Sequence, residues 1–256
     1  MLKIIASIFT ILILAVVLNA CKNNSTNPPP LNNNNNFPNG DGSTYKFSVE
    51  KTDSNGIQTT GTRNTDYAGT QVKDNTTYQV QIDSFNLSGV SEISLSYFRK
   101  ANDGVFYFLD TTGLASIVPD SLKNYLSIDT ELRELLFPLN ANSTWPVFKL
   151  SLHYTIFVLS IIDVTAAYDG TESLTLHLTS GDVTEDAVRI KYTLSLTIPN
   201  STNTNTYSAY AWFVDGIGIV KWQGSGVILN AFAGSGVNLT DTTSVITQSL
   251  ISYNLK

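Results

Sequence analysis

Few side chains in this sequence are of types that could bind a metal ion or act as a nucleophile. The 256 residues include two histidines and one cysteine, whereas a zinc site needs several His or Cys ligands. His153 and His177 each fall on the polar face of an expected strand, because polar and apolar residues alternate around them. We therefore expect both histidines to be solvated, and we predict no metal site and no cofactor.

Acid–base chemistry would have to come from carboxylates in two expected turns. The candidates are Asp169 and Glu172 beside Gly170, and Asp182, Glu185 and Asp186 further along the chain. A glycosidase needs two carboxyl groups at roughly 5–9 Å, and sequence alone does not establish that distance. Turn carboxylates more often serve solubility, and the chain contains neither His-Glu-x-x-His nor Gly-x-Ser-x-Gly. We predict no catalytic residue and no enzymatic activity.

Glycine-rich motifs also give no catalytic signal. Gly-Ser-Gly-Val occurs twice, at 224–227 and at 234–237. Neither copy has the lysine or the strand–helix context of a phosphate-binding loop. We interpret these glycines as turns or bulges in a sheet.

The single cysteine follows a segment with the features of a secretory signal. The chain begins Met1-Leu2-Lys3, continues with an apolar run from Ile4 to Val17, and soon reaches Cys21. A short basic start, an apolar run of about 7–15 residues and small residues before a cut are typical of such signals. A membrane span takes about 20 apolar residues, so the run is short for one. The alternatives are an ordinary signal peptide cut near Ala20 and an uncleaved anchor helix.

The residues Leu18-Asn19-Ala20-Cys21 resemble the lipobox of bacterial lipoproteins. The resemblance implies that the Cys21 thiol receives a diacylglyceryl group and that the chain is cut before it. Stable anchoring takes two acyl chains or more, at about 0.8 kcal/mol for each buried CH₂. The membrane is thus the expected partner of the lipid on Cys21. Lys22 stands where enterobacterial lipoproteins of the inner membrane carry aspartate, which favours the outer membrane. The domain could lie on either face of that membrane.

Residues 21–43 are interpreted as a lipidated tether between a signal peptide, 1–20, and a folded domain. They include three consecutive prolines at 28–30 and five consecutive asparagines at 32–36. Such a segment has little to bury and cannot offset the entropy cost of folding. About 210 residues remain, which can form one core, and no second linker follows. We assign 44–256 to a single β-rich extracytoplasmic domain.

The charge balance argues against nucleic acid as a partner. Removal of residues 1–20 deletes one basic residue, so 14 of the 15 basic residues remain against 21 acidic ones, a net charge of −7. Such a surface repels nucleic acid and anionic lipid headgroups. With its cysteine committed to lipid, the mature chain could form no internal disulfide, so its stability must come from burial.

Alternation of apolar and polar residues dominates the expected domain. The clearest run places six apolar residues at period two: Val188, Ile190, Tyr192, Leu194, Leu196 and Ile198. Shorter runs occupy 45–50, 78–83 and 93–97. Period two predicts antiparallel strands with one wet face. The predicted fold class is mainly β: a curved antiparallel sheet or an incomplete β-barrel, with one or two short helices as cover.

Two segments depart from this alternation. Between Pro119 and Phe137, apolar residues at helical spacing predict one or two short helices, the second of which contains Leu132, Leu135 and Leu136. Residues 154–162 are apolar on both faces, so we expect a central buried strand.

Two further segments resemble parts of uncharacterised envelope lipoproteins. Residues 135–148, LLFPLNANSTWPVF, resemble their PL-x-x-G-x-x-W segment, with Asn142 where a glycine is usual. Residues 210–222, YAWFVDGIGIVKW, resemble their WF-x-x-G-[VI]-G-x-V-K hairpin. Those proteins are similar in character to LolA/LolB lipoprotein carriers, which implies a curved sheet wrapped round helices and transfers no catalytic residue. From the residues themselves, Asp215-Gly216 predicts the hairpin turn, and Gly218 predicts a bulge or a close backbone approach.

Three functions are compatible with these features. The first is a non-enzymatic envelope lipoprotein that binds a lipid or other hydrophobic ligand in an apolar cavity, which the 24 Tyr and Phe residues could line. The second is a surface structural or adhesion module. The third and least favoured is a carbohydrate-active enzyme that uses the turn carboxylates. A closed apolar cavity would favour the first over the second, and two carboxylates converging in a cleft would favour the third.

Overall fold

A computed structural model describes residues 36–111, 120–154, 156–197, 204–232 and 242–256, and strands dominate them. The strands up to the 3₁₀-helix are β1 (Thr44–Thr52), β2 (Gln58–Lys73), β3 (Thr76–Leu87), β4 (Val90–Ala101) and β5 (Gly104–Phe108). The 3₁₀-helix η3 (Asp120–Tyr125) is followed by β6 (Leu126–Ile128), β7 (Glu131–Leu136), β8 (Thr144–Tyr154), β9 (Phe157–Leu178) and β10 (Gly181–Thr197). The last elements are β11 (Thr204–Val214), β12 (Gly218–Ser225), helix α2 (Gly226–Phe232) and β13 (Val245–Asn254).

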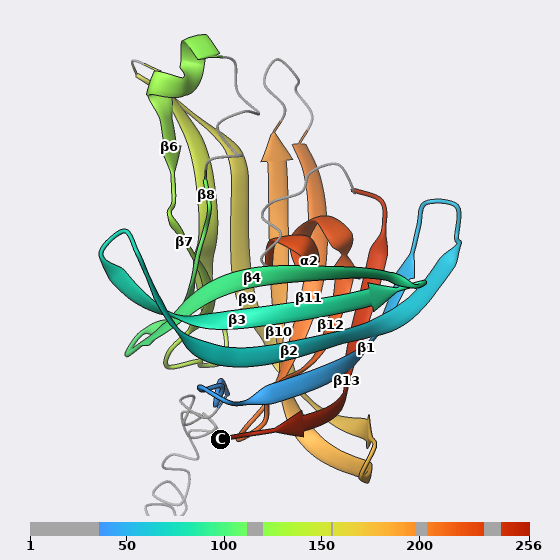
Figure 1. The fold of residues 1–256 in the computed structure, drawn as a ribbon. Coiled ribbons are helices and arrows are strands. Elements are labelled where there is room, and N and C mark those ends of the chain that lie inside the picture. The colour runs from blue at the N-terminus through green and yellow to red at the C-terminus, as the bar shows by residue number, and fades with distance from the viewer. Residues whose placement is uncertain (1–35, 112–119, 155, 198–203, 233–241) are drawn as a thin grey trace, which may run out of the picture. The chain divides into compact units, whose positions relative to one another are not determined.

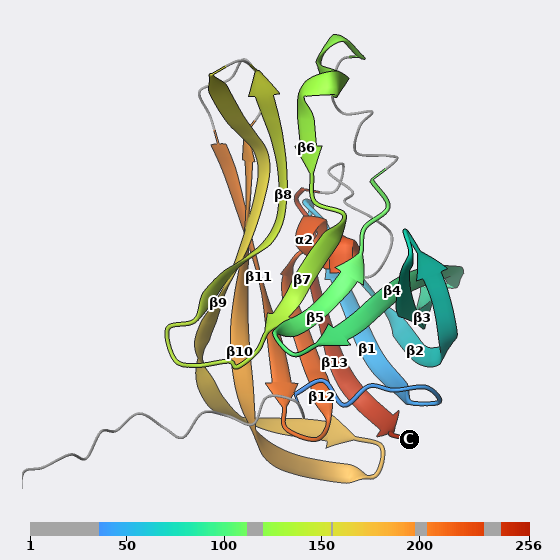
Figure 2. The ribbon, with the colours of Figure 1, turned by 90° about the vertical axis from the view of Figure 1, so that its left-hand side faces the viewer.

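The strands form one sheet of 13 members in the order β6-β8-β9-β10-β11-β12-β13-β1-β2-β3-β4-β5-β7. Every paired neighbour is antiparallel. Strands β2, β3 and β4 run across β9 to β12 in Figure 1, and Figure 2 shows the sheet curving over itself. The Trp145 indole of β8 donates to the Arg133 carbonyl of β7 at 3.2 Å, so the two ends approach without joining in a ladder of the described strands. The predicted fold class, a curved antiparallel sheet, is confirmed.

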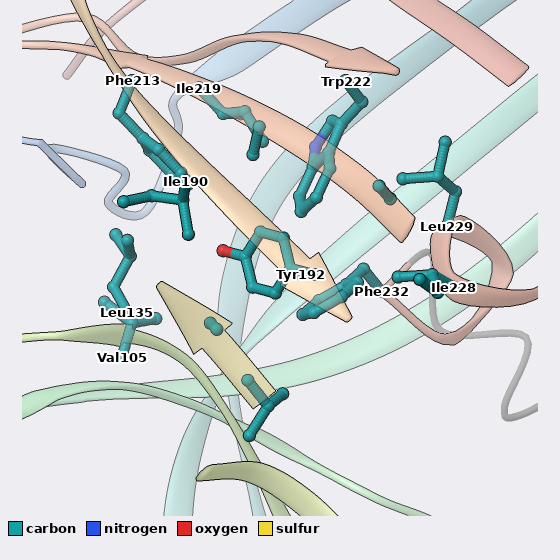
Figure 3. Packing of buried hydrophobic residues seen from close by; sticks show 14 of the residues in the cluster. Val105, Leu135, Ile190, Tyr192, Phe213, Ile219, Trp222, Ile228, Leu229 and Phe232 are labelled. Atoms are coloured by element: carbon teal, nitrogen blue, oxygen red, sulfur yellow. The ribbon is translucent and has the colours of Figure 1, made fainter. Parts of the chain in front are cut away.

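We call β2 to β4 and β9 to β12, which cross in Figure 1, the two arms of the sheet. The core lies between these two arms. The alternating residues of β10 point into it as predicted, because Ile190, Tyr192 and Leu194 are all fully buried. The ring of Tyr192 packs against Phe232 of α2 at a centroid distance of 4.8 Å and against Trp222 of β12 at 5.5 Å (Figure 3). Helix α2 thus fills the interior with its apolar side chains.

Helix α2 was not predicted, because the glycines at 224–227 were interpreted as turns or bulges in the sheet. Gly224, predicted as a turn or bulge, lies in β12 close to the neighbouring strand, because a Cβ there would lie 2.4 Å from the Ala209 Cα. Gly226 instead begins the helix and lies against Ser244, whose Oγ would be 2.2 Å from an added Cβ. The second Gly-Ser-Gly-Val copy, 234–237, lies outside the described residues.

The predicted helix at Leu132, Leu135 and Leu136 is wrong, because this segment is strand β7. β7 pairs with β5 so that Val105 faces Leu135 and Phe106 faces Arg133. The register shift leaves Glu134 as the extra residue of a bulge, which lets Leu132 and Leu135 both point inward. Two buried leucines three residues apart therefore imitate helical spacing. The first predicted helix is present as the 3₁₀-helix η3.

Two strand predictions also need correction. Residues 154–162 are not a uniformly buried strand, since Ile156, Phe157 and Val158 are 62–87% exposed where β8 turns into β9. Only the later part of the run, from Ile161, enters the core. In β4, Ile93 and Leu95 are 71% and 49% exposed, so their apolar face points outward there.

The hairpin between β11 and β12 confirms its predicted turn. The amide of Ile217 donates to the Val214 carbonyl at 3.1 Å, and Gly216 has a positive φ of 74°. Gly218, with φ of 94°, lies so close to the preceding chain that a Cβ would meet the Asn39 side chain at 2.9 Å. The predicted close approach at Gly218 is therefore present, and it requires glycine.

Residues 36–43, expected to belong to the tether, pack onto the sheet. Phe37 is 1% exposed and meets Phe98 edge-on at a centroid distance of 5.3 Å. The Asn39 amide donates to the Tyr67 hydroxyl at 2.5 Å and accepts from the Tyr45 hydroxyl at 2.9 Å. The folded part of the chain therefore includes residues before 44.

Candidate functional site

A bulge in β9 brings two of the predicted carboxylates to one arginine on the outer face of the sheet. Arg189 pairs with Gly170 and Ile190 with Tyr168, so Asp169 is the extra residue between them. Gly170 adopts a φ of 126°, which favours glycine. Ile190 points into the core, so Arg189 points outward, to the side where Asp169 and Glu172 meet it.

The arginine holds both carboxylates. Its Nε donates to Asp169 Oδ2 at 2.7 Å, and its Nη1 donates to Glu172 Oε2 at 3.2 Å. The indole Nε1 of Trp212 donates to the other Glu172 oxygen. On the far side, Lys221 Nζ lies 4.7 Å from the centre of the Trp212 ring. Arg189, Trp212 and Lys221 are direct neighbours across β10, β11 and β12, which explains why they meet.

A hollow of about 440 Å³ lies beside this cluster. Its lining consists of Asp169, Arg189, Tyr210, Trp212, Gln223, Gly224 and Val245. The hollow combines aromatic surface with donors and acceptors, which is the usual composition of a small-molecule site. We call these seven residues together with Glu172 and Lys221 the outer-face site.

A second hollow of about 410 Å³ lies at the other arm of the sheet. It is lined by Asp74, Thr76, Tyr78, Arg99, Phe108, Thr130 and Glu131. Arg99 donates twice to Glu131, at 2.6 and 2.5 Å, and the Tyr78 hydroxyl donates to the same carboxylate at 2.6 Å. Burial and this carboxylate raise the pKa of Tyr78 to about 12. Burial alone would raise the pKa of Glu131, but the bonds from Arg99 and Tyr78 hold it below its ordinary value.

A third polar group lies inside the core, on the inner face of β2 and β3. Asp83 accepts hydrogen bonds from Arg63 at 2.7 Å, Thr65 at 2.6 Å and Gln81 at 2.8 Å. Arg63 also donates to Gln248 at 2.9 Å. These side chains are buried, and three of the four bonds join different strands, so the network fixes how β2, β3 and β13 meet.

Glu134, the bulge residue of β7, faces the same interior. Burial raises its pKa to about 8, and the Arg63 guanidinium and the Tyr107 hydroxyl offset part of that rise. Its Oε2 has no hydrogen-bond partner among the described groups. A shifted carboxyl is a signal of possible function, but Glu134 is 4% exposed and lines neither hollow. We assign it to the structure of the core.

The remaining predicted residues do not converge. His153 is exposed on β8, and His177 is exposed near the tip of the β9–β10 hairpin, where its Nδ1 lies 3.0 Å from Asp182. Asp182 and Asp186 are exposed, Glu185 is partly exposed, and none of the three lines either hollow. Cys21 lies outside the described residues. Within the described ranges, no three His, Cys, Asp or Glu side chains are placed to hold a metal ion, and no helix is long and apolar enough to cross a membrane.

Sequence reasoning missed the cations and aromatic residues that complete these clusters. In the sequence, Arg189 is one of the polar residues between the alternating apolar ones of 188–198, and Trp212 is part of the predicted hairpin at 210–222, so neither was a site candidate. A signal was present, since a charged residue inside a long alternating strand is expected to lie on the outer face, beside its cross-strand neighbours. Which residues become those cross-strand neighbours, however, depends on the register between the strands, and that register could not be predicted from the sequence.

Comparison with known proteins gives only remote likeness. No family model and no curated protein matches the chain. A solved structure described as an exported protein with a YmcC-like fold, from Bacteroides fragilis, is 14% identical, with 85% of this chain and 98% of that chain covered and a TM-score of 0.44. One described as a lipoprotein from Parabacteroides distasonis is 14% identical, with coverages of 86% and 98% and a TM-score of 0.42.

A third similar structure is YmcC of Escherichia coli, described as a hypothetical lipoprotein. It is 10% identical, with 88% of this chain and 90% of that chain covered and a TM-score of 0.34. All three TM-scores lie below 0.5, so the likeness establishes neither a shared family nor a shared function for this chain.

Proposed function

We propose that this chain is a non-enzymatic lipoprotein of the bacterial cell envelope, anchored by acyl chains on Cys21. The observation that carries the proposal is the Leu18-Asn19-Ala20-Cys21 sequence between an apolar run and an Asn/Pro-rich segment. A lone cysteine at that point has a purpose if it is the lipid attachment site, since diacylation supplies the two chains that stable anchoring takes. Lys22 favours the outer membrane as the destination.

The tether is shorter than the sequence alone suggests. Because residues 36–43 pack onto the sheet, only 22–35 remain between the cysteine and the described domain. Fully stretched, this segment could reach about 45 Å at ~3.3 Å per residue. The domain would then stand at most about one domain diameter from the membrane surface.

We favour binding at the surface of the domain over binding in an apolar cavity. The aromatic residues that could have lined a cavity pack against one another, as Tyr192, Trp222 and Phe232 do (Figure 3). Both hollows are instead lined by charged, polar and aromatic side chains together. These observations support the surface module over the carrier of a hydrophobic ligand.

The arrangement of Asp169 and Glu172 supports a non-enzymatic role. A glycosidase needs one carboxyl group to protonate the leaving group and a second to attack or activate water. Here Arg189 lies between the two and binds an oxygen of each, while Trp212 occupies the remaining side of Glu172. The pair is thus committed to one cation.

Metabolic labelling with an alkyne-palmitate analogue tests the anchor. We expect the full-length chain, expressed in a Gram-negative host, to incorporate the label and to partition with the outer membrane. Cys21→Ser should abolish labelling and remove the protein from the outer membrane, whereas Asn23→Ser, outside the four-residue motif, should leave both unchanged. A wild-type chain that carries no label, or a Cys21→Ser chain that stays labelled, would overturn the proposal.

A further inference from the structure

We propose that the outer-face site binds a neutral saccharide. The inference adds a ligand class to the lipoprotein function proposed above and rests on the seven residues that line the 440 Å³ hollow. Neither the lipobox nor any likeness to other proteins enters the argument.

The outer-face site has hydrogen-bond donors and acceptors that are not used in hydrogen bonds between its own residues. Arg189 uses two of the five N–H donors of its guanidinium on Asp169 and Glu172. Tyr210 and Gln223 line the hollow, and the Tyr210 hydroxyl and the Gln223 amide have no hydrogen-bond partner among the described residues. A sugar hydroxyl both donates and accepts, so it can be satisfied by a neighbouring amide, phenol and guanidinium at the same time.

The charge of the site favours an uncharged ligand. Arg189 and Lys221 contribute two positive charges, and Asp169 and Glu172 contribute two negative charges, which sum to zero. A phosphate or a uronic acid would meet the two carboxylates, and an amine would meet the two cations. The electrostatic potential of the site therefore favours neither an anionic nor a cationic ligand.

The aromatic residues supply the apolar part of the binding surface. The rings of Tyr210 and Trp212 lie 6.1 Å apart at an interplanar angle of 43°. Trp212 is 5% exposed, so Tyr210, which is only partly buried, offers the larger accessible ring. The faces of sugar rings carry C–H groups that pack against such aromatic surface, which has a negative face. Gly224 contributes only backbone to the lining of the hollow.

The second hollow is a useful contrast because it contains the same types of residue. There, both oxygens of Glu131 are taken up by Arg99 and Tyr78, and the Arg99 guanidinium lies 4.3 Å from the centre of the Phe106 ring. The phenol and the carboxylate are thus engaged within this cluster, although Arg99 keeps spare N–H donors as Arg189 does. Of these two hollows, both lined by described residues, the outer-face site is the one with a phenol and an amide that lack a partner among those residues.

The test uses the full-length acylated chain in lauryldimethylamine oxide micelles, whose headgroup is not a sugar. The chain is first applied to an array that covers neutral hexose, N-acetylhexosamine and deoxyhexose glycans as well as acidic glycans. The best neutral glycan is then titrated by calorimetry. We expect Gln223→Ala and Tyr210→Phe each to weaken its binding by about tenfold, and Gln71→Ala, an exposed glutamine of β2 outside the hollow, to leave it unchanged.

Three results would overturn the proposal: binding to no neutral glycan, binding to acidic glycans alone, or neutral binding that Gln223→Ala and Tyr210→Phe do not weaken. The Cys21→Ser chain separates this inference from the anchor. It should lose the lipid and keep the glycan affinity, whereas Gln223→Ala should keep the lipid. Failure of one proposal is therefore visible without failure of the other.

Discussion

Two arginine–aspartate pairs lie on opposite faces of the same sheet and share an N–O distance of 2.7 Å. In the inner pair, the side chains of Arg63 and Asp83 are 8% and 0% exposed. In the outer pair, those of Arg189 and Asp169 are 34% and 32% exposed. The two ion pairs therefore have the same N–O distance, although one is buried and the other is partly exposed to water. A buried pair is costly to break because the remaining charge stays desolvated, whereas an exposed pair contributes little to stability and can offer its spare donors to a ligand.

Removal of one inner partner should give the largest effect. Asp83→Ala leaves the Arg63 guanidinium buried, and it also removes the acceptor of Thr65 and Gln81. We expect the free energy of unfolding to fall by about 3–5 kcal/mol, measured by urea denaturation. The matched control is Asp103→Ala, whose carboxylate pairs with Arg133 at 2.7 Å but is 59% exposed, and which should cost less than about 1 kcal/mol. Similar losses in the two variants would contradict the comparison.

The buried carboxyl of Glu134 should make stability depend on pH. Its pKa is about 8 in the folded chain, against an ordinary value of ~4.3 in the unfolded chain. Between these values the folded state keeps a proton that the unfolded state has released, so stability must fall as pH rises through this window. The slope from Glu134 should be at most about 1.4 kcal/mol per pH unit, the value for one proton, and stability should level off above about pH 8.

Urea denaturation between pH 5 and pH 9 checks this expectation. Glu134→Gln keeps the shape and removes the charge, so it should lose that slope and become the more stable protein at the alkaline end. Glu185→Gln, a partly exposed acid on β10, serves as the control and should follow the wild-type curve. Parallel curves for Glu134→Gln and the wild type would show that Glu134 does not carry the pH dependence.

The contrast between the two faces also separates what the sequence could and could not predict. Alternation identified the inner face of β10 correctly, because period two reports burial directly. It failed at β7, where the bulge at Glu134 changes the period, and at Ile93 and Leu95, where the outer face is the apolar one. An alternating sequence shows that the two faces of a strand differ in polarity. Which of these two sides faces the core is decided by tertiary packing.

The candidate site was predictable in part for the same reason. The prediction that Asp169 and Glu172 flank a turn is wrong, because both lie inside strand β9 at its bulge, but they are neighbours and share one partner. Their arginine and tryptophan are distant in sequence and meet them only through the β9–β10 and β10–β11 registers. The buried Arg63–Asp83 pair left no sequence signal, because each residue occupies an alternating strand position where a charge is expected to be solvated.

Loss of a single hydroxyl should have an intermediate effect on the inner side. The Tyr192 hydroxyl donates to the Glu134 backbone carbonyl at 2.9 Å and so links β10 to the bulge of β7. Tyr192→Phe keeps the ring packing, so we expect a loss of about 1 kcal/mol, the net value of one buried hydrogen bond. Tyr210→Phe removes a hydroxyl from the outer-face site and should change stability by less than about 0.5 kcal/mol. Thermal unfolding of both variants would contradict this ranking if Tyr210→Phe were the more damaging change.

Breaking the outer pair should cost far less than breaking the inner one, and the cost should depend most strongly on salt. Arg189→Gln leaves Asp169 and Glu172 close together without their shared cation, so at low ionic strength we expect a loss of up to about 1 kcal/mol. Exposed charges are screened over a Debye length of about 8 Å at physiological salt and 3 Å at 1 M, so this loss should shrink toward zero in concentrated sodium chloride. Asp83→Ala should keep most of its penalty there, because desolvation of a buried charge is not relieved by ions that cannot reach it. Urea denaturation of the two variants at low and high salt therefore tests the comparison directly: two penalties with the same salt dependence would mean that burial does not distinguish the pairs.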